Sequence, residues 1–413
     1  MDYINRYYDA GFRQKFGKPY VQVIFGARQT GKSTLVRNLI PPDATVVDLA
    51  DPRERARFAM NPGMLIDLCA SLSGNPSTVL VDEAQTVPAL FDAVQFLYDG
   101  DRDRYRFILC GSSARRLRMT GANLLPGRSV RHVLHPLVHA EYASIGQESA
   151  PMILPPVLPP PPLGAPRFPA RSLANRMVFG DLPGIALAPS DSDRADVLSA
   201  YATAYLEEEL RREAAVKDWG CFLRFLTLAA RESGGIVNFS ALSRETGLAA
   251  ATVKGYYQLL EDMFIGFTVP AFSGSPRKSV LSSPRFFFFD LGVRNAAAGI
   301  PLTEDSVNAT PGPLFEHWVA NQLWRRLSYD NSGSLSYYRT SDGAEVDFIL
   351  ETPAGIVPIE VKWTDNPTDR DARHLKAFMA EHRDRCSRGY VVSRCPHVLT
   401  LADGIRAIPW YAV

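Results

Sequence analysis

The segment GARQTGKS, residues 26–33, has the spacing of a phosphate-binding loop, G-x-x-x-x-G-K-[ST], and lies between an apolar run and an amphipathic stretch. Its two glycines let successive backbone N–H groups point at phosphates, at the positive end of a following helix. The Lys32 ammonium can reach the β- and γ-phosphates, and the Ser33 hydroxyl can ligate Mg²⁺. We therefore expect ATP and Mg²⁺ to bind at Gly26, Ala27, Arg28, Gln29, Thr30, Gly31, Lys32, Ser33 and Thr34.

A second motif, TVLVDEAQ at residues 78–85, ends an apolar, strand-like run with two adjacent carboxylates. Asp82, at the carboxyl end of a parallel strand, would hold the water shell of Mg²⁺. Glu83 can orient or deprotonate the attacking water. Paired acids after a strand are commonly only solvent-exposed, so the catalytic interpretation depends on the phosphate-binding loop.

Two further positions in this region could take part in catalysis. The run RFILCGSS, residues 106–113, ends at hydroxyls, and Ser112 could contact the γ-phosphate or the attacking water; the alternative is a plain strand-to-loop turn. Arg128, in LLPGRS, could reach the phosphates of a neighbouring subunit as an arginine finger; the alternative is an exposed basic loop. A finger acting between subunits implies a homo-oligomer, such as a hexameric ring.

A third set of residues with catalytic side chains begins almost three hundred residues after the phosphate-binding loop. FEHWVANQL supplies Glu316 on a helix, AEVDFIL supplies Asp347, and IEVKW supplies Glu360 and Lys362, which face the same side of a strand. A hairpin turn at TPAG can bring Asp347 beside Glu360, so that two carboxylates could hold Mg²⁺ next to a lysine. This D-x(n)-E-x-K pattern is similar to that of the restriction-endonuclease-like fold. Either a cutting site or a nuclease-like fold that only binds is compatible with it.

The elements that must position these residues follow from the hydrophobic pattern. Apolar runs alternate with amphipathic stretches over residues 18–145, as in a parallel sheet with crossover helices. Residues 151–169 are too proline-rich for a helix or an inner strand and indicate a semi-rigid spacer or an extended surface loop. Helical patterns dominate from about residue 171 to 270, and strands and helices alternate again from about residue 311.

Residues 222–272 show a helix-turn-helix pattern followed by a hairpin, which predicts a winged helix. Ser240 is the expected cap of its second helix. The third helix offers Lys254 as its one clear cation, whereas Glu261 and Asp262 carry the opposite charge. A DNA-reading helix usually brings more cations, so a packing or protein-binding role is the alternative.

The bulk composition is that of a globular protein of two to four domains: 413 residues, 46% hydrophobic and 22% charged. The net charge of +1, from 45 basic and 44 acidic residues, means that a nucleic-acid surface has to be a local patch. Five cysteines without a CxxC pair argue against disulfides and zinc. With neither a signal core nor an apolar run of membrane-spanning length, we expect a cytoplasmic protein without a membrane partner.

The order GARQTGKS, VDEAQ, LCGSS and LLPGR, followed by FFFFDLGVRN, LFEHWVANQL, EVDFIL and IEVKW, resembles the prokaryotic predicted ATPases of the AAA+ class. In these proteins an AAA-type domain precedes a DUF4143-type C-terminal domain. The resemblance implies an α/β chain with an AAA-type P-loop domain over residues 1–145, a helical and winged-helix region over 171–300, and a restriction-endonuclease-like domain over 301–413. The proline-rich linker over 146–170 follows from composition and does not belong to the family pattern.

Three functions are compatible with this organisation. The first is an ATPase that acts on DNA, in remodelling, branch migration or defence. The second is an ATP-controlled protein-interaction switch whose nuclease-like domain does not cut. The third is an ATP-licensed, Mg²⁺-dependent nuclease.

Overall fold

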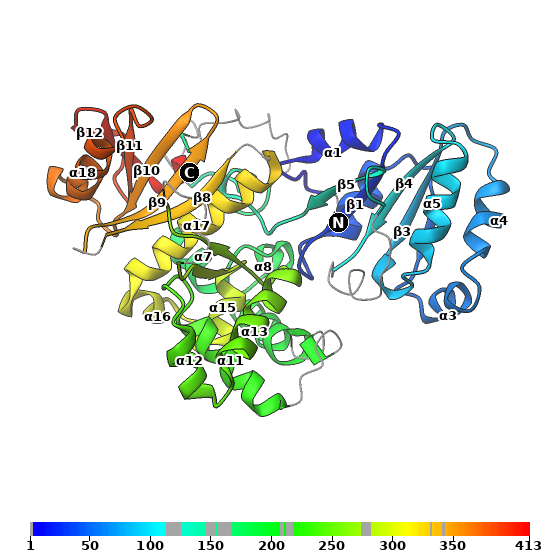
Figure 1. Cartoon of the computed structure of the whole chain (residues 1–413), viewed down its shortest axis with the longest axis horizontal. Helices are drawn as coiled ribbons and strands as arrows, with labels where there is room; N and C mark the ends of the chain where they lie inside the picture. The colour runs from blue at the N-terminus through cyan, green and yellow to red at the C-terminus, as the bar shows by residue number, and fades with distance from the viewer. Residues whose placement is uncertain are drawn as a thin grey trace. The chain divides into compact units, whose positions relative to one another are not determined.

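A computed structural model describes residues 3–112, 125–145, 153–154, 167–206, 210–211, 218–273, 282–330, 333–340 and 343–413. Most of the proline-rich stretch predicted as a linker lies outside these residues. The chain divides into two compact units (Figure 1). The segment up to His135 and Asp262–Phe264 belong to the first unit, and the second contains most of the rest.

Two bulk features of the described residues concern membrane spans and thiols. None of their helices is long and apolar enough to cross a membrane. The five cysteines, all within the described ranges, are free thiols.

The first unit contains a five-stranded parallel sheet in the order β2-β3-β4-β1-β5. Its inner strands are buried almost continuously, as expected of a parallel sheet covered on both faces. The strands are β1 (Val21–Phe25), β2 (Thr45–Asp48), β3 (Ser77–Asp82), β4 (Tyr105–Cys110) and β5 (Ser129–Val133). The helices are α1 (Asp9–Phe16), α2 (Lys32–Leu39), α3 (Pro52–Met60), α4 (Met64–Ala70), η1 (Ala84–Thr86) and α5 (Leu90–Gly100).

Strand register places the chemically important strand ends at one edge of this sheet. Ile108 of β4 lies opposite both Gln22 of β1 and Leu80 of β3. Because all these strands run in the same direction, the residues after β1, β3 and β4 leave the sheet side by side. This is the edge at which open α/β sheets bind ligands.

The second unit is built around a six-stranded mixed sheet in the order β12-β13-β11-β10-β9-β8. β10 pairs in parallel with β11 and antiparallel with β9, where Phe348 lies opposite Ile359. The next pair outward is Asp347 and Glu360, so the hairpin brings these carboxylates together as predicted. The strands are β8 (Ser334–Arg339), β9 (Glu345–Thr352), β10 (Gly355–Val361), β11 (Gly389–Ser393), β12 (Leu399–Ala402) and β13 (Ile405–Pro409).

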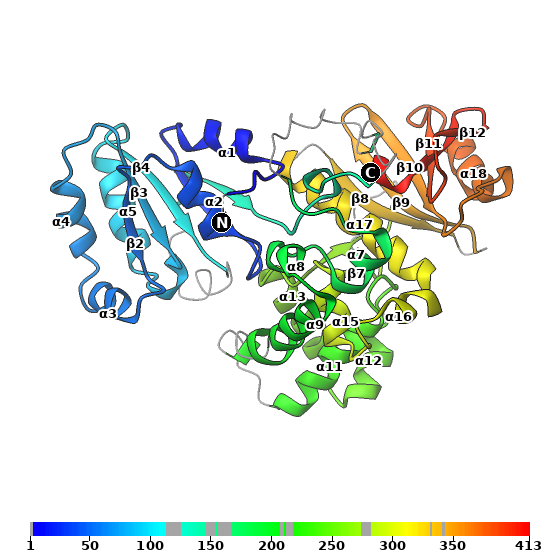
Figure 2. The ribbon, with the colours of Figure 1, turned by 180° about the vertical axis from the view of Figure 1, so that it is seen from behind.

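The helices of the second unit include the long α17 (Pro311–Asp330) and α18 (Arg373–Glu381), which accompany the sheet. Figures 1 and 2 both show α11, α12, α13 and α15 gathered in one helical group. The elements preceding the sheet are η2 (His139–Glu141), α7 (Leu173–Phe179), α8 (Pro183–Leu187), α9 (Asp191–Ala200), the π-helix η3 (Tyr201–Leu206), α11 (Trp219–Arg231), α12 (Phe239–Thr246), α13 (Ala250–Asp262), β6 (Gly266–Val269), β7 (Arg285–Phe288), α15 (Leu291–Ala297) and α16 (Glu304–Ala309). Short 3-10 helices, η4 (Asp369–Ala372) and η5 (Trp410–Ala412), complete the unit.

Helices α12 and α13 are joined by a turn at Gly247, whose positive φ of 73° favours glycine. The antiparallel pair β6–β7 follows them. The predicted cap at Ser240 is wrong: the Asn238 side chain accepts the N–H of Ala241 at 3.0 Å, so α12 begins two residues earlier than expected. The winged-helix assignment itself stays a prediction.

A buried ionic network joins the helices of the second unit. Asp181 accepts hydrogen bonds from Arg176 at 2.8 Å and from Arg325 at 2.9 Å, and its own N–H donates to Asp290 at 2.7 Å. Burial raises the pKa of Asp181, but the two arginines outweigh it and lower the pKa to about 2. Because a buried charge is tolerated only with partners, these residues fix how α7, α15 and α17 pack.

Candidate functional site

The predicted phosphate-binding loop connects the end of β1 to the start of α2. Gly26 has a φ of 150°, and a Cβ there would lie 2.3 Å from the Leu134 carbonyl oxygen. Gly31 precedes α2 with a φ of 90°, and Gln29 also has a positive φ, of 62°. The two predicted glycines therefore stand where the backbone conformation requires them.

The side chains of this loop fold over its own carbonyls. Lys32, 7% exposed, donates from Nζ to the carbonyl oxygens of Gly26 and Ala27, each at 2.8 Å. Thr30 donates from Oγ1 to the Ala27 carbonyl at 2.9 Å. The ammonium thus lies within the turn of the loop, where it can exchange carbonyl partners for phosphate oxygens. The other predicted loop side chains differ in exposure: Arg28 is half-buried and Thr34 is exposed.

The two predicted magnesium ligands are in contact. Ser33 donates from Oγ to Oδ1 of the buried Asp82 at 3.1 Å, a separation of 49 residues along the chain. Arg37 lies 3.6 Å from the other Asp82 oxygen and pairs with Asp48 at 2.6 Å. A hydroxyl beside a carboxylate at a phosphate loop is a donor set that fits Mg²⁺.

Glu83 is linked to Ser112 through Gln85, a residue to which the sequence interpretation gave no role. Gln85 donates from Nε2 to Glu83 Oε2 at 2.5 Å and to Ser112 Oγ at 3.1 Å. Its Oε1 is buried and has no hydrogen-bond partner among the described residues. Glu83 itself has a positive φ of 55°, a conformation that a non-glycine residue adopts rarely. The spacing E-A-Q was visible in the sequence, but only the fold shows that it bridges two strands.

Arg6 is a second residue that the sequence interpretation missed. Its guanidinium is buried and donates to the Thr30 carbonyl and to the His135 carbonyl, each at 2.8 Å. It therefore ties the phosphate-binding loop to the segment after β5. No local pattern in the N-terminal residues signals this contact, because its partners are 24 and 129 residues away.

Arg128 lies far from this group in the same chain. Its carbonyl accepts the N–H of Val21, the first residue of β1, whereas the phosphate-binding loop follows the last. The Arg128 side chain pairs with Asp99 at 2.6 Å. Arg128 is thus at the opposite edge of the sheet, and its role as a finger toward another subunit stays a prediction.

The carboxylates of the second unit also meet. Asp347 accepts the Val361 N–H at 2.7 Å, and Lys362 pairs with Glu360 Oε1 at 2.6 Å. Oε2 of Glu360, a residue only 5% exposed, has no hydrogen-bond partner in the described part of the chain. Glu316 is ion-paired with Arg285, which also donates to the Asp347 carbonyl at 3.3 Å.

Burial and mutual repulsion raise the pKa values of these acids. Burial, with Asp347 adding to it, raises the pKa of Glu360 to about 8 and that of Glu316 to about 7. Burial also raises the pKa of Asp347. Within the described ranges no three or more His, Cys, Asp or Glu side chains are grouped to hold a metal ion. Of the three carboxylates, Glu316 is the one that pairs with an arginine, Arg285.

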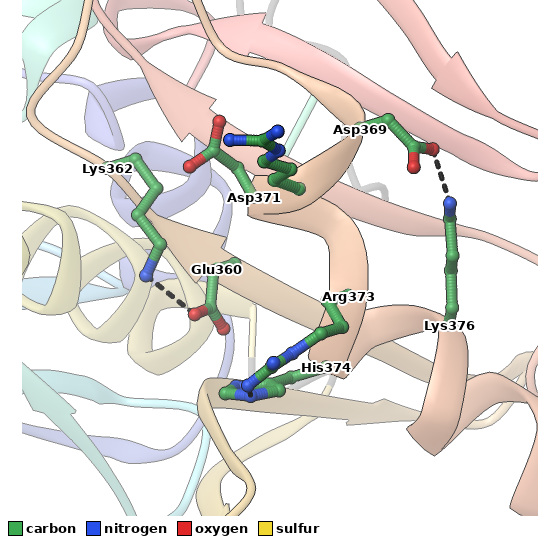
Figure 3. A pocket seen from close by; sticks show the side chains of 8 residues that line it. Glu360, Lys362, Asp369, Asp371, Arg373, His374 and Lys376 are labelled. Atoms are coloured by element: carbon green, nitrogen blue, oxygen red, sulfur yellow. Dashed lines mark hydrogen bonds and ion pairs between the residues drawn. The ribbon is translucent and has the colours of Figure 1, made fainter.

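A cavity of about 420 Å³ opens beside Glu360 and Lys362 (Figure 3). Its opposite wall is formed by η4 and the first residues of α18. This wall carries the side chains of Asp369, Arg370, Asp371, Arg373, His374 and Lys376.

Comparison with known proteins identifies three segments. The family model of an AAA domain matches residues 18–143, a domain of unknown function, DUF8612, matches 170–304, and another, DUF4143, matches 311–413. Uncharacterized proteins of Mycobacterium bovis and Mycobacterium tuberculosis are each 25% identical over 407 residues, covering 97% of this chain and 82% of the relative.

Two solved structures show weak overall likeness. A DNA polymerase III gamma subunit-related protein of Thermotoga maritima is 13% identical, with a TM-score of 0.24 over 75% of this chain and 98% of that one. A protein of Vibrio cholerae is 13% identical, with a TM-score of 0.18 over 94% of each chain. The family matches confirm the order that the motifs predicted: a match to an AAA domain is followed by a match to a DUF4143 domain.

Proposed function

We propose that the first unit binds ATP with Mg²⁺ and hydrolyses it. The observation that carries this proposal is the contact of Ser33 with Asp82, beside the hydrogen-bonded series Glu83–Gln85–Ser112. The AAA domain match indicates ATPase activity in general. The proposal assigns the phosphates, the metal and the attacking water to separate side chains at this edge of the sheet.

Each residue has a distinct part in this proposal. The loop N–H groups and Lys32 bind the phosphates, while Ser33 and Asp82 hold Mg²⁺, which neutralises charge on the phosphate oxygens when bound. Glu83 takes the proton of the attacking water. Gln85 holds the Glu83 carboxylate by one hydrogen bond and the Ser112 hydroxyl by another. Gln85 Oε1, which has no hydrogen-bond partner among the described residues, is a further acceptor beside Glu83 and Ser112.

The variant Glu83→Gln tests this assignment. We expect ATP affinity within about 3-fold of the wild type, but a hydrolysis rate lower by about 10²–10³-fold, because the amide cannot accept the proton. Binding of a fluorescent ATP analogue and release of phosphate are the two measurements. Equal hydrolysis by the variant and the wild type would remove Glu83 from the mechanism.

We further propose that hydrolysis serves an action on DNA, such as remodelling, branch migration or defence. The support is local: the carboxylate pair Asp347 and Glu360 beside Lys362 is a donor set suited to a metal and a phosphodiester. Arg128 acting between subunits, in a ring or hexamer, belongs to the same proposal. ATP hydrolysis that no form of DNA changes would favour the alternative, an ATP-controlled protein-interaction switch.

A Mg²⁺-dependent nuclease is the second candidate function. The specific observation in its favour is Glu360 Oε2, a buried carboxylate oxygen that has no hydrogen-bond partner among the described residues and lies near the half-buried Asp347. Such an oxygen is costly to bury unless a proton or a cation satisfies it. Mg²⁺-dependent cutting of DNA by the wild type and its loss in Glu360→Ala would support this function. An intact DNA substrate after incubation with the wild type would leave the domain a binding role.

A further inference from the structure

We propose that the cavity beside Glu360 and Lys362 seats a phosphate group of a nucleic-acid strand, held by Arg370 and Arg373. The inference rests on the proposed action of the chain on DNA and names the residues that would contact the strand. It does not require that the site of Asp347 and Glu360 cleaves the nucleic-acid strand.

The cavity is formed by two elements of the second unit. Glu360 and Lys362 come from the end of β10, and the opposite wall comes from η4 and the start of α18. Figure 3 shows the Lys362–Glu360 pair on one side and the Lys376–Asp369 pair on the other, with Arg373 and His374 beneath Glu360. The cavity therefore borders Glu360, one of the two carboxylates of the pair.

Its charges are not balanced within the protein. Lys362 pairs with Glu360 and Lys376 with Asp369, while Asp371 accepts the N–H of Thr368 at 2.7 Å and its hydroxyl at 3.1 Å. Asp371 keeps its charge, so the four cations of the lining exceed its three carboxylates by one, and no carboxylate among the described residues pairs with either guanidinium group. Among the described residues, Arg370 has no side-chain partner, and Arg373 has one, the His374 ring.

The His374 ring fixes Arg373 in position. Its Nδ1 lies 2.9 Å from the Glu345 carbonyl oxygen, which can only accept, so Nδ1 carries the proton. Nε2 is therefore an acceptor and receives the Arg373 Nη2–H at 2.9 Å. This single bond orients the guanidinium and leaves its other N–H groups for a ligand.

A phosphate is the ligand that this arrangement recognises best. Two planar guanidinium groups present N–H pairs that match the oxygens of a phosphate, with Lys362 as a third cation nearby. Arg370, Arg373 and Lys376 are exposed, so their wall of the cavity faces solvent and a continuous strand can pass over it. A free nucleotide shares this chemistry and is distinguished by the test.

The test measures binding of a fluorescent single-stranded oligonucleotide to the full chain in the absence of ATP. The variant Arg370→Gln/Arg373→Gln is compared with Arg388→Gln/Arg406→Gln, which removes two exposed arginines around a different cavity of the same sheet. We expect the first variant to raise the Kd at least ~10-fold and to reduce the salt slope by about 1.4, and the second to change the Kd less than about 2-fold.

Three outcomes would overturn the proposal. They are an unchanged Kd in the first variant, an equal loss in both variants, and displacement of the oligonucleotide by 5′-dAMP at an equal phosphate concentration, which would make the cavity a nucleotide site. ATP hydrolysis is measured on the same preparations. Thermal unfolding curves that match the wild type show that both variants fold. A wild type without hydrolysis would contradict the proposed ATPase while leaving the strand-binding result valid.

Discussion

Arg6 shows how strongly single side chains from remote segments define the phosphate site. Its two hydrogen bonds hold the carbonyls of Thr30 and His135. A guanidinium that makes two buried bonds fixes a loop better than a flexible ammonium does. The conformation of the phosphate-binding loop therefore depends on a residue that contacts neither phosphate nor metal in the proposed mechanism.

We expect Arg6→Gln to raise the Kd for ATP by about 10-fold, because two buried hydrogen bonds that hold the loop are lost. The exposed Arg13 of α1 is the matched control, and Arg13→Gln should bind ATP like the wild type. Titration of a fluorescent ATP analogue into both variants measures the effect. Equal affinities in the two variants would show that the loop does not depend on Arg6.

His317 is a residue through which pH acts on the second unit. Burial lowers its pKa to about 3, and Nε2 contacts the Phe288 carbonyl at 2.8 Å. Below pH 6.5 the unfolded chain takes up a proton that the folded imidazole does not, so this group lowers the free energy of unfolding as the pH falls.

The free energy of unfolding of His317→Gln is compared with that of the wild type at pH 7.5 and pH 5.5. From pH 7.5 to pH 5.5 the free energy of unfolding of the wild type should fall by about 1.4 kcal/mol more than that of the variant. Any excess of the wild-type value over the variant value therefore becomes smaller at pH 5.5. Urea titrations at both pH values provide the measurement. A difference that stays constant with pH would mean that the folded imidazole is protonated as readily as the unfolded one.

At the scale of elements, the proposed ATP site depends on the positions at which β1, β3 and β4 end. β1, β3 and β4 deliver Gly26, Glu83 and Ser112 to one edge of the sheet, and register alone brings them together. At this edge the backbone has little freedom, because a Cβ on Gly26 would meet the Leu134 carbonyl.

Gly26→Ala should destabilise the first unit by at least ~2 kcal/mol and abolish ATP binding, since both its φ and its contact with Leu134 exclude a side chain. Gly100→Ala is the control, because a Cβ on Gly100, at the end of α5, has no atom within 4 Å. Thermal unfolding and ATP binding of the two variants are compared. Normal ATP binding by Gly26→Ala would mean that the loop can relax around the methyl group.

The local patterns predicted the elements of the site better than the contacts within it. Gly26, Lys32 and Ser33 share one short motif whose spacing is itself the physical requirement, so they could be placed from the sequence. The hairpin that joins Asp347 to Glu360 was also predictable, because its turn is short. Gln85, Arg6 and Arg285 act through partners brought close only by the folded sheet or helices, and no local spacing encodes those contacts.

At the scale of the whole molecule, the chain combines an AAA domain with a DUF4143 domain. Its near-zero net charge hides local imbalances such as Arg370 and Arg373 near Glu360, for which the described part of the chain supplies no carboxylate partner. A chain of this kind can bind a polyanion at one place without a general positive field. We thus propose ATP chemistry for the first unit and strand contact for the second.

The most direct test of the central claim is the rate of ATP hydrolysis by the purified protein, with Lys32→Ala as the blank, in Mg²⁺ and in EDTA. We predict Mg²⁺-dependent hydrolysis by the wild type that Lys32→Ala abolishes, and a higher wild-type rate with single-stranded, duplex or branched DNA. Absence of hydrolysis in the wild type, or an equal rate in Lys32→Ala, would contradict the account.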